Sequence, residues 1–221
     1  MIVPENILEQ INFLTVLLIE KSYSAKQNFS SINKYLNDKT VVSWAKTNKL
    51  SETFDKKLSY REVYDICRDR KYYNLVLVDG AIIQFYYEFQ STTLLNHRVA
   101  FLPSPYLEEF QNQPDLYVDD LIYAEVINRS IVPSPLRFDY DKKSFKEVEH
   151  PQSHLTIGQY QNCRIPVKSA ITPFQFINFI FNNFYNNTLV NTEIFNKCND
   201  IYFGDSITKI ESSLVHLNFE V

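Results

Sequence analysis

The dipeptide Asp79-Gly80 constrains the fold of this chain more than any other feature of its sequence. It lies between two runs rich in β-branched, aliphatic and aromatic residues, 75–78 and 81–89. Asp-Gly between two such runs is the strongest short-range signal for a β-hairpin. We therefore expect an antiparallel pair of strands here, and a fold built around an antiparallel sheet.

Further segments alternate apolar with polar residues or are rich in strand formers, as half-buried strands are. The predicted strands are 96–102, 136–140, 153–160, 163–167 as a continuation or partner of the strand before it, and the alternating run 214–221.

Helical spacing and capping signals predict helices before and after these strands. The predicted helices are 5–21, a short one from Ser30 or Ser31 to about residue 37, 59–70, and a helix that follows Thr172. Ser59-x-x-Glu62 and Thr172-Pro173-x-Gln175 are capping boxes, in which side chains satisfy the first backbone N–H groups of a helix. The helix after Thr172 is apolar nearly all round, so we expect it to be the buried central helix.

These elements predict the α+β class, with hairpin-connected strands and helices at either end. The expected architecture is an antiparallel sheet of about five to seven strands packed on the buried helix of the C-terminal half, with N-terminal helices flanking it. We expect a single domain over 1–221, with an N-terminal helical part (1–57), the sheet and core helix (58–187) and a C-terminal extension (188–221).

Composition excludes several function classes. The chain has only 3 glycines in 221 residues, where average usage would give roughly 15, so P-loop and dinucleotide-binding fingerprints are excluded. The net charge is −4 and no block of Lys or Arg is present, which argues against a broad duplex-DNA surface. The longest apolar run, 13–19, is far shorter than the ~20 residues of a membrane span, so no membrane partner is expected.

The three cysteines, Cys67, Cys163 and Cys198, are far apart and odd in number. No disulfide framework or zinc ribbon is therefore expected, and a reducing, cytoplasmic location fits best. The sequence leaves the identity of any cofactor open.

Five motifs of the sequence form a recognisable set. They are Val78-Asp-Gly-Ala-Ile-Ile-Gln-Phe-Tyr-Tyr-Glu-Phe, Leu136-Arg-Phe-Asp-Tyr-Asp, His150-Pro-Gln-Ser-His154-Leu-Thr-Ile-Gly, Cys163-Arg-Ile-Pro-Val and Thr172-Pro-Phe-Gln-Phe-Ile-Asn-Phe-Ile. Together they resemble the bacterial family catalogued as domain of unknown function 2290. The resemblance covers roughly 60–185 and is expected to extend over the whole chain. It implies a bacterial cytosolic protein, and it brings no catalytic residues to carry over.

The candidate site follows from the alternation of side chains along two predicted strands. Arg137 and Asp139 share one face of 136–141, and His154 lies on one face of 153–159. If the strands pair, these side chains meet, and Arg164 and His150 could join them. A carboxylate beside an imidazole orients it for acid–base work, and an arginine binds an anion. We therefore predict His154, His150 and Asp139 as catalytic and Arg137 and Arg164 as phosphate-binding; the alternative is a solvated face with a structural Arg–Asp pair.

Two further patterns are weaker. His154-x-Thr156 fits an element of two-histidine phosphoesterases, but the second copy would have to be His216, followed by Asn218 instead of Ser or Thr. Asp79 and Glu88 resemble the carboxylates of a metal-dependent nuclease core, which bind a divalent ion that activates water. Gln90 replaces the expected lysine there. Asp79 and Glu88 are thus the alternative, metal-binding site.

Two hypotheses of function remain. The first is a protein that acts on or binds a nucleic-acid or nucleotide phosphate, of the toxin or phage-defence type. The second is a non-enzymatic adaptor or subunit that binds a partner protein, such as one from the same operon, through the aromatic segment 106–132.

Overall fold

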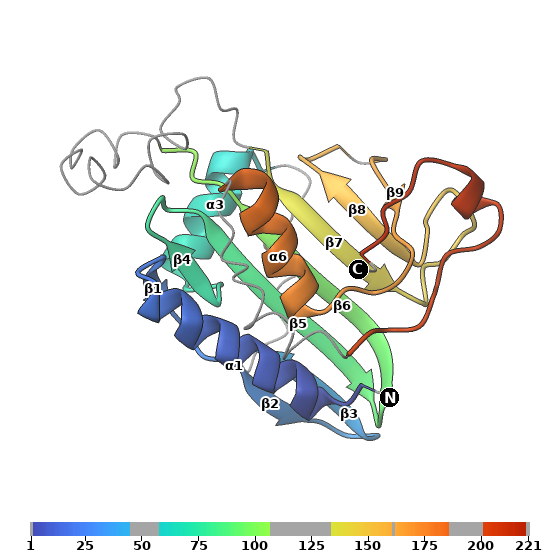
Figure 1. The fold of residues 1–221 in the computed structure, drawn as a ribbon, viewed down its shortest axis with the longest axis horizontal. Coiled ribbons are helices and arrows are strands. Elements are labelled where there is room, and N and C mark those ends of the chain that lie inside the picture. Colours follow the sequence, from blue (N-terminus) through green and yellow to red (C-terminus); the bar gives the residue numbers. More distant parts are fainter. Residues whose placement is uncertain (1, 45–57, 107–133, 161, 186–200, 220–221) are drawn as a thin grey trace.

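The computed structural model describes residues 2–44, 58–106, 134–160, 162–185 and 201–219. Their strands form a nine-stranded antiparallel sheet of order β1-β4-β5-β6-β7-β8-β9, in which β3 pairs with β5 and β2 pairs with β3 (Figure 1). The strands are β1 Ser24–Gln27, β2 Ser31–Lys34, β3 Lys39–Ser43, β4 Leu75–Leu77, β5 Ile82–Gln90, β6 Thr93–Leu102, β7 Leu136–Asp141, β8 Ser153–Ile157 and β9 Ile165–Pro166.

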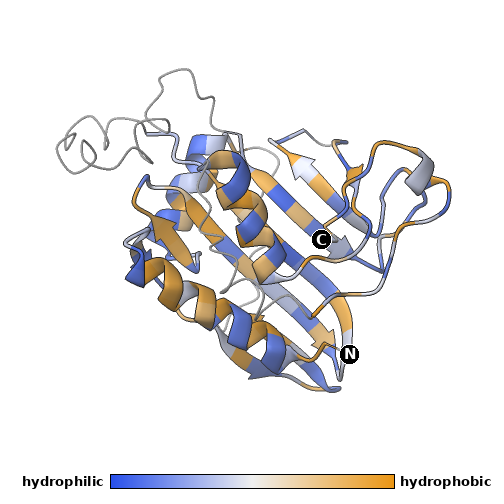
Figure 2. Cartoon of the chain, in the orientation of Figure 1, coloured by the Kyte–Doolittle hydropathy of each residue, from blue (hydrophilic) through white to orange (hydrophobic). Residues whose placement is uncertain are grey.

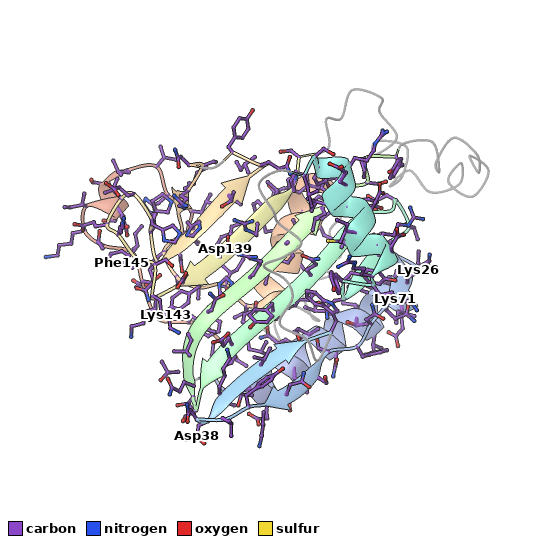
Figure 3. The ribbon with its side chains drawn as sticks, turned by 180° about the vertical axis from the view of Figure 1, so that it is seen from behind. Lys26, Asp38, Lys71, Asp139, Lys143 and Phe145 are labelled. Carbon is purple, nitrogen blue, oxygen red and sulfur yellow. The ribbon has the colours of Figure 1, made fainter. Side chains whose placement is uncertain are left out.

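The predicted α+β class is confirmed, with more strands than the five to seven expected. Two helices, α1 (Pro4–Glu20) and α6 (Pro173–Phe184), lie on one face of the sheet, and α3 (Tyr60–Asp69) lies on the other (Figures 1 and 3). Figure 2 shows hydrophobic and hydrophilic residues alternating along β7. The face of the sheet that carries α1 and α6 is apolar. On the opposite face, the part under α3 is also apolar, with Val76, Ile82, Ala100 and Leu102, whereas the part around β7 is polar. We call this second part the polar face.

The hairpin predicted at Asp79-Gly80 is confirmed. β4 and β5 pair with Leu75 opposite Ile83. Gly80 has φ of +80°, which a residue without a Cβ adopts at little cost. The Asp79 carboxylate accepts a hydrogen bond from the backbone N–H of Ala81 at 2.9 Å, which closes the turn.

The helix predicted from Ser30 or Ser31 to residue 37 is wrong, because β2 occupies this segment. Between β2 and β3, Asn37 and Asp38 have φ of 59° and 53° and turn the chain into β3. Positive φ at both central residues is typical of the type I′ turn of a hairpin. β3 then pairs with β5, so ladder hydrogen bonds to the sheet outweigh the weak local helix signal.

The strand predicted over 214–221 is also wrong for its described part. Residues 214–219 contain only an isolated bridge, between Leu217 and Val167. The adjoining edge strand, β9, has two residues, and one is Pro166, which has no N–H to donate to a ladder. The segment 163–167 itself contains β9, which is an antiparallel partner of β8.

The helix after Thr172 is confirmed as α6, with both capping-box hydrogen bonds formed by Thr172 and Gln175. Most of its apolar side chains are buried between the sheet and α1, whereas Phe184, in its last turn, is exposed. Phe176 makes edge-to-face contacts with Phe85 and Phe138, with ring centroids 5.8 and 6.0 Å apart. The buried apolar side chains of α6 are Phe174, Phe176, Ile177, Ile180 and Phe181.

Ile177→Ala should therefore lower the free energy of unfolding by about 2–5 kcal/mol, because Ile177 is 1% exposed and its loss leaves a cavity. Urea unfolding followed by circular dichroism measures this loss. Asn182→Ala, an exposed position on the same helix, is the matched control and should change stability by less than about 0.5 kcal/mol. Equal midpoints for the two variants would contradict the assignment of α6 to the core.

The described residues include two of the three cysteines and all the helices of the fold described above. Cys67 is buried and Cys163 half-buried, and neither forms a disulfide; Cys198 lies outside the described residues. None of the described helices has the length and apolar character needed to cross a membrane.

Candidate functional site

The polar face of the sheet carries a row of side chains that come from neighbouring strands. In the register, Arg98 of β6 lies opposite Asp139 of β7, and Asp139 lies opposite His154 of β8. Directly opposed side chains on one face have Cβ atoms about 5 Å apart. Figure 3 shows Asp139 on this face, away from α6. The predicted pairing of the two strands, with Asp139 beside His154, is thus present.

Asp139 binds two arginines at once. Its Oδ1 accepts a hydrogen bond from Nε of Arg98 at 2.8 Å, and its Oδ2 accepts one from Nε of Arg137 at 2.5 Å. Asp139 is 7% exposed, whereas the arginine side chains are 28% and 27% exposed. Burial by itself would raise the pKa of Asp139, but the two guanidinium charges outweigh it and hold this pKa well below its usual range.

His154 lies beside Asp139 on the neighbouring strand β8 and is only 3% exposed. Its Nε2 is 3.7 Å from Oδ2 of Asp139, and its Nδ1 is 2.9 Å from the carbonyl oxygen of Pro151. Burial lowers the pKa of His154, and the attraction of Asp139 opposes this only in part. The neutral ring therefore carries its proton on Nδ1, where the carbonyl can accept it.

The other two predicted residues lie at the edge of this cluster. The ring of His150 is 4.9 Å from that of His154, and its Nδ1 is 2.6 Å from the carbonyl oxygen of Ser144. Arg164 is half-buried, and its Nη1 donates to the carbonyl oxygen of Glu149 at 3.3 Å. The structure thus brings Asp139, His154, His150 and Arg137 together, with Arg164 beside them.

A cavity of about 270 Å³ adjoins the cluster, between the start of α3 and the segment after β8. Its polar lining includes Arg137, Thr156, Tyr160 and Arg164, and its apolar lining includes Leu58, Val63, Ala100, Leu102 and Leu136. Because Arg137 both contacts Asp139 and lines the cavity, a ligand in the cavity would meet a guanidinium whose orientation is already set. Small-molecule sites commonly combine an apolar wall with a few placed polar groups.

The alternative metal site does not assemble in the described structure. Asp79 is buried in its turn, where it accepts a hydrogen bond from the Tyr185 hydroxyl on the α6 side. Glu88, near the far end of β5, pairs with Lys39 at 2.9 Å. Within the described residues, no three His, Cys, Asp or Glu side chains come together as metal ligands would.

The second phosphoesterase histidine does not join the site either. His216 is exposed, and its Nδ1 is 2.9 Å from the carbonyl oxygen of Leu214. The aromatic segment 106–132, on which the adaptor hypothesis depends, lies outside the described residues after Tyr106.

Arg98 and Tyr160 are the members of the site that the sequence analysis missed. Arg98 alternates with His97 and Val99, so the strand pattern places it on the polar face, but only the pairing of β6 with β7 brings it to Asp139. Tyr160 is 75% exposed at the cavity. A single tyrosine in a loop gives no sequence signal for such a position.

Comparison with known proteins identifies the family. Residues 22–219 match the family model described as "Uncharacterized conserved protein (DUF2290)", and the chain therefore belongs to this family. No curated protein and no solved structure matches it.

Proposed function

We propose that this member of the DUF2290 family binds the phosphate group of a nucleotide or nucleic acid in the cavity beside Arg137. The observation that carries the proposal is the arginine pair held by one buried carboxylate at the edge of that cavity.

The charges of the cluster favour an anion. Arg98 and Arg137 carry two positive charges against the single negative charge of Asp139, and Arg164 adds a third cation at the cavity. The Nε–H of each of these two arginines donates to Asp139, which fixes the direction of both guanidinium groups. Guanidinium groups hydrogen-bond phosphate oxygens in pairs, so a phosphate is the ligand that this arrangement suits.

The cavity favours an aromatic group attached to that phosphate. Its apolar lining and the exposed ring of Tyr160 can contact a planar base. Inorganic phosphate has no such group and cannot make these contacts. Its volume, about 270 Å³, is close to the lower end of the ~300–1,000 Å³ common for small-molecule sites. A mononucleotide unit combines both requirements.

Asp139 and His154 are positioning residues in this proposal. Asp139 orients the two arginines. His154 lies beside Asp139 and is too deeply buried to offer a ligand much contact surface. The acid–base roles of His150 and His154 stay predictions, as do the toxin or defence role and the adaptor role.

Calorimetric titration with adenosine 5′-monophosphate, adenosine and inorganic phosphate tests the proposal. The monophosphate should bind more tightly than either part alone. Arg164→Gln should lower the affinity for the monophosphate about tenfold, which is the effect of losing one charge-assisted hydrogen bond. This variant leaves the Asp139 pairs intact.

Arg70→Gln is the matched control, because Arg70 is exposed at the opposite end of α3 from the cavity. It should bind the monophosphate as the wild type does. Adenosine binding as tightly as its monophosphate, or equal affinities for the two arginine variants, would show that the cavity does not recognise phosphate.

A further inference from the structure

A second cavity lies on the other side of Arg164. It has a volume of about 690 Å³, and Lys146, Glu149, His150, Asn162 and Arg164 are among its lining residues. Lys146 and Arg164 contribute two positive charges against one from Glu149, so this cavity also favours an anion. Because Arg164 lines both cavities, they adjoin one another at its side chain.

The two cavities differ in chemistry. The first has an apolar wall and the exposed Tyr160 ring, whereas the side chains of the second are mostly charged or polar. An apolar pocket followed by a cationic, polar one matches the order of a base and the sugar-phosphate chain that continues from it.

The ring of Tyr160 lies close to the backbone of Gly158, two residues before it in the chain. Gly158 has φ of +64°, and a Cβ there would be 3.3 Å from the Tyr160 ring. A glycine is therefore what lets the ring lie against the backbone at this point. The ring remains 75% exposed, so its surface is open to a stacking partner.

From these observations we infer that the ligand is a single-stranded polynucleotide, with one base in the first cavity and its backbone crossing Arg164 into the second. This inference rests on the proposed phosphate-binding function and narrows it from a mononucleotide to a strand. A duplex is disfavoured, because its stacked bases cannot enter a pocket and because the net charge of −4 leaves no broad basic surface.

The segment that carries Lys146 allows a clean test. The backbone of Lys146 exchanges two hydrogen bonds with that of His150, at 3.0 and 2.7 Å, while its side chain is exposed. Lys146→Gln therefore removes a charge from the second cavity without altering the loop. Lys143→Gln is the matched control, since Lys143 is exposed on the same loop and does not line the cavity (Figure 3).

The experiment measures fluorescence anisotropy with labelled 12-nucleotide oligo(dT) and oligo(U), a 12-base-pair duplex, and adenosine 5′-monophosphate as competitor. The single strands should bind more tightly than the monophosphate or the duplex. Lys146→Gln should weaken single-strand binding about tenfold and leave the monophosphate unaffected. It should also reduce the slope of log K against log salt by about 0.7, the value for one backbone phosphate.

Arg164→Gln should weaken the binding of both the single strands and the monophosphate. Lys143→Gln should change neither affinity. If the monophosphate binds and a strand binds no more tightly, or Lys146→Gln leaves strand affinity unchanged, the inference fails while the proposed function stands. Preference for the duplex would also overturn it. Binding of neither ligand would remove the proposed function and this inference together.

Discussion

Asp139→Asn should lower the free energy of unfolding by about 3 kcal/mol. Removing one partner of a buried ion pair costs ~3–5 kcal/mol, and the partial exposure of the arginines, at 28% and 27%, moves the effect toward the lower end. The substitution keeps the shape of the side chain. It leaves Arg98 and Arg137 as two like charges without the carboxylate that holds them.

The effect should depend on pH in a defined direction. The folded pKa of Asp139 lies below the ordinary value of about 3.9. The unfolded chain therefore binds the proton first as the pH falls, and the stabilisation is complete above pH ~4 and is lost below it. The difference in stability between wild type and Asp139→Asn should thus be constant from pH 7 to 5 and shrink in more acidic solution.

Urea unfolding at several pH values measures both effects. Asp141→Asn is the matched control, because Asp141 lies two residues along the same strand and accepts hydrogen bonds only from its own turn, at Lys143 and Ser144. It should cost about 1 kcal/mol or less. If both variants lose the same free energy of unfolding, the ion pairs of Asp139 with the two arginines stabilise the fold no more than the hydrogen bonds of an ordinary turn.

The second large effect is acid destabilisation through His97. This histidine of β6 is buried at 1% exposure, where its Nε2 accepts a hydrogen bond from the backbone N–H of Ile171 at 3.1 Å. Burial lowers its pKa to about 3, although the charge of Asp139 acts in the opposite direction. The side chain therefore stays neutral in the folded protein at pH 7.

As the pH falls below about 6.5, the unfolded chain protonates this histidine while the folded chain does not. Stability is then lost at up to about 1.4 kcal/mol per pH unit, or ~5 kcal/mol by pH 3. His97→Gln retains an acceptor for Ile171 and cannot titrate. Between pH 6 and 4, the free energy of unfolding of this variant should therefore fall less steeply than that of the wild type. The two slopes should differ by about 1 kcal/mol per pH unit.

His154 contributes in the same direction, because burial also lowers its pKa. Its contribution remains in the His97→Gln variant, so the difference between the two slopes isolates His97. His216→Gln, at an exposed histidine, is the control for loss of an imidazole. A slope for His97→Gln that matches the wild type would show that His97 is hydrated or protonated in the folded state.

Burial changes what we expect of His154→Ala. From the strand pattern alone, this substitution should reduce function and leave the fold intact. At 3% exposure, and with Nδ1 beside the carbonyl of Pro151, the ring is part of the packed structure. His154→Ala should therefore lower stability as well as ligand binding, whereas Arg164 and Lys146 are more exposed and can be replaced without disturbing the core.

Short-range signals in the sequence determined the elements whose structure depends on neighbouring residues. The turn at Asp79-Gly80 and the capping boxes at Ser59 and Thr172 satisfy backbone groups within a few residues, so their motifs are sufficient to predict them. The same holds for the faces of β7 and β8, because side chains alternate along any strand. Arg137, Asp139 and His154 could therefore be assigned to one face from the sequence.

Only the tertiary structure decided which strands are neighbours, and this determines the site. Two pairings depend on hydrogen bonds between segments far apart in the chain. They are the register that places Arg98 opposite Asp139, and the pairing of β3 with β5 that joins the 31–43 hairpin to the sheet. The burial of His154 and the two cavities that share Arg164 depend on loops that no periodic pattern describes. Turns and helix caps depend on residues a few positions apart, so a short motif predicts them. The pairing of distant strands depends on the packing free energy of the whole sheet, which no short motif contains.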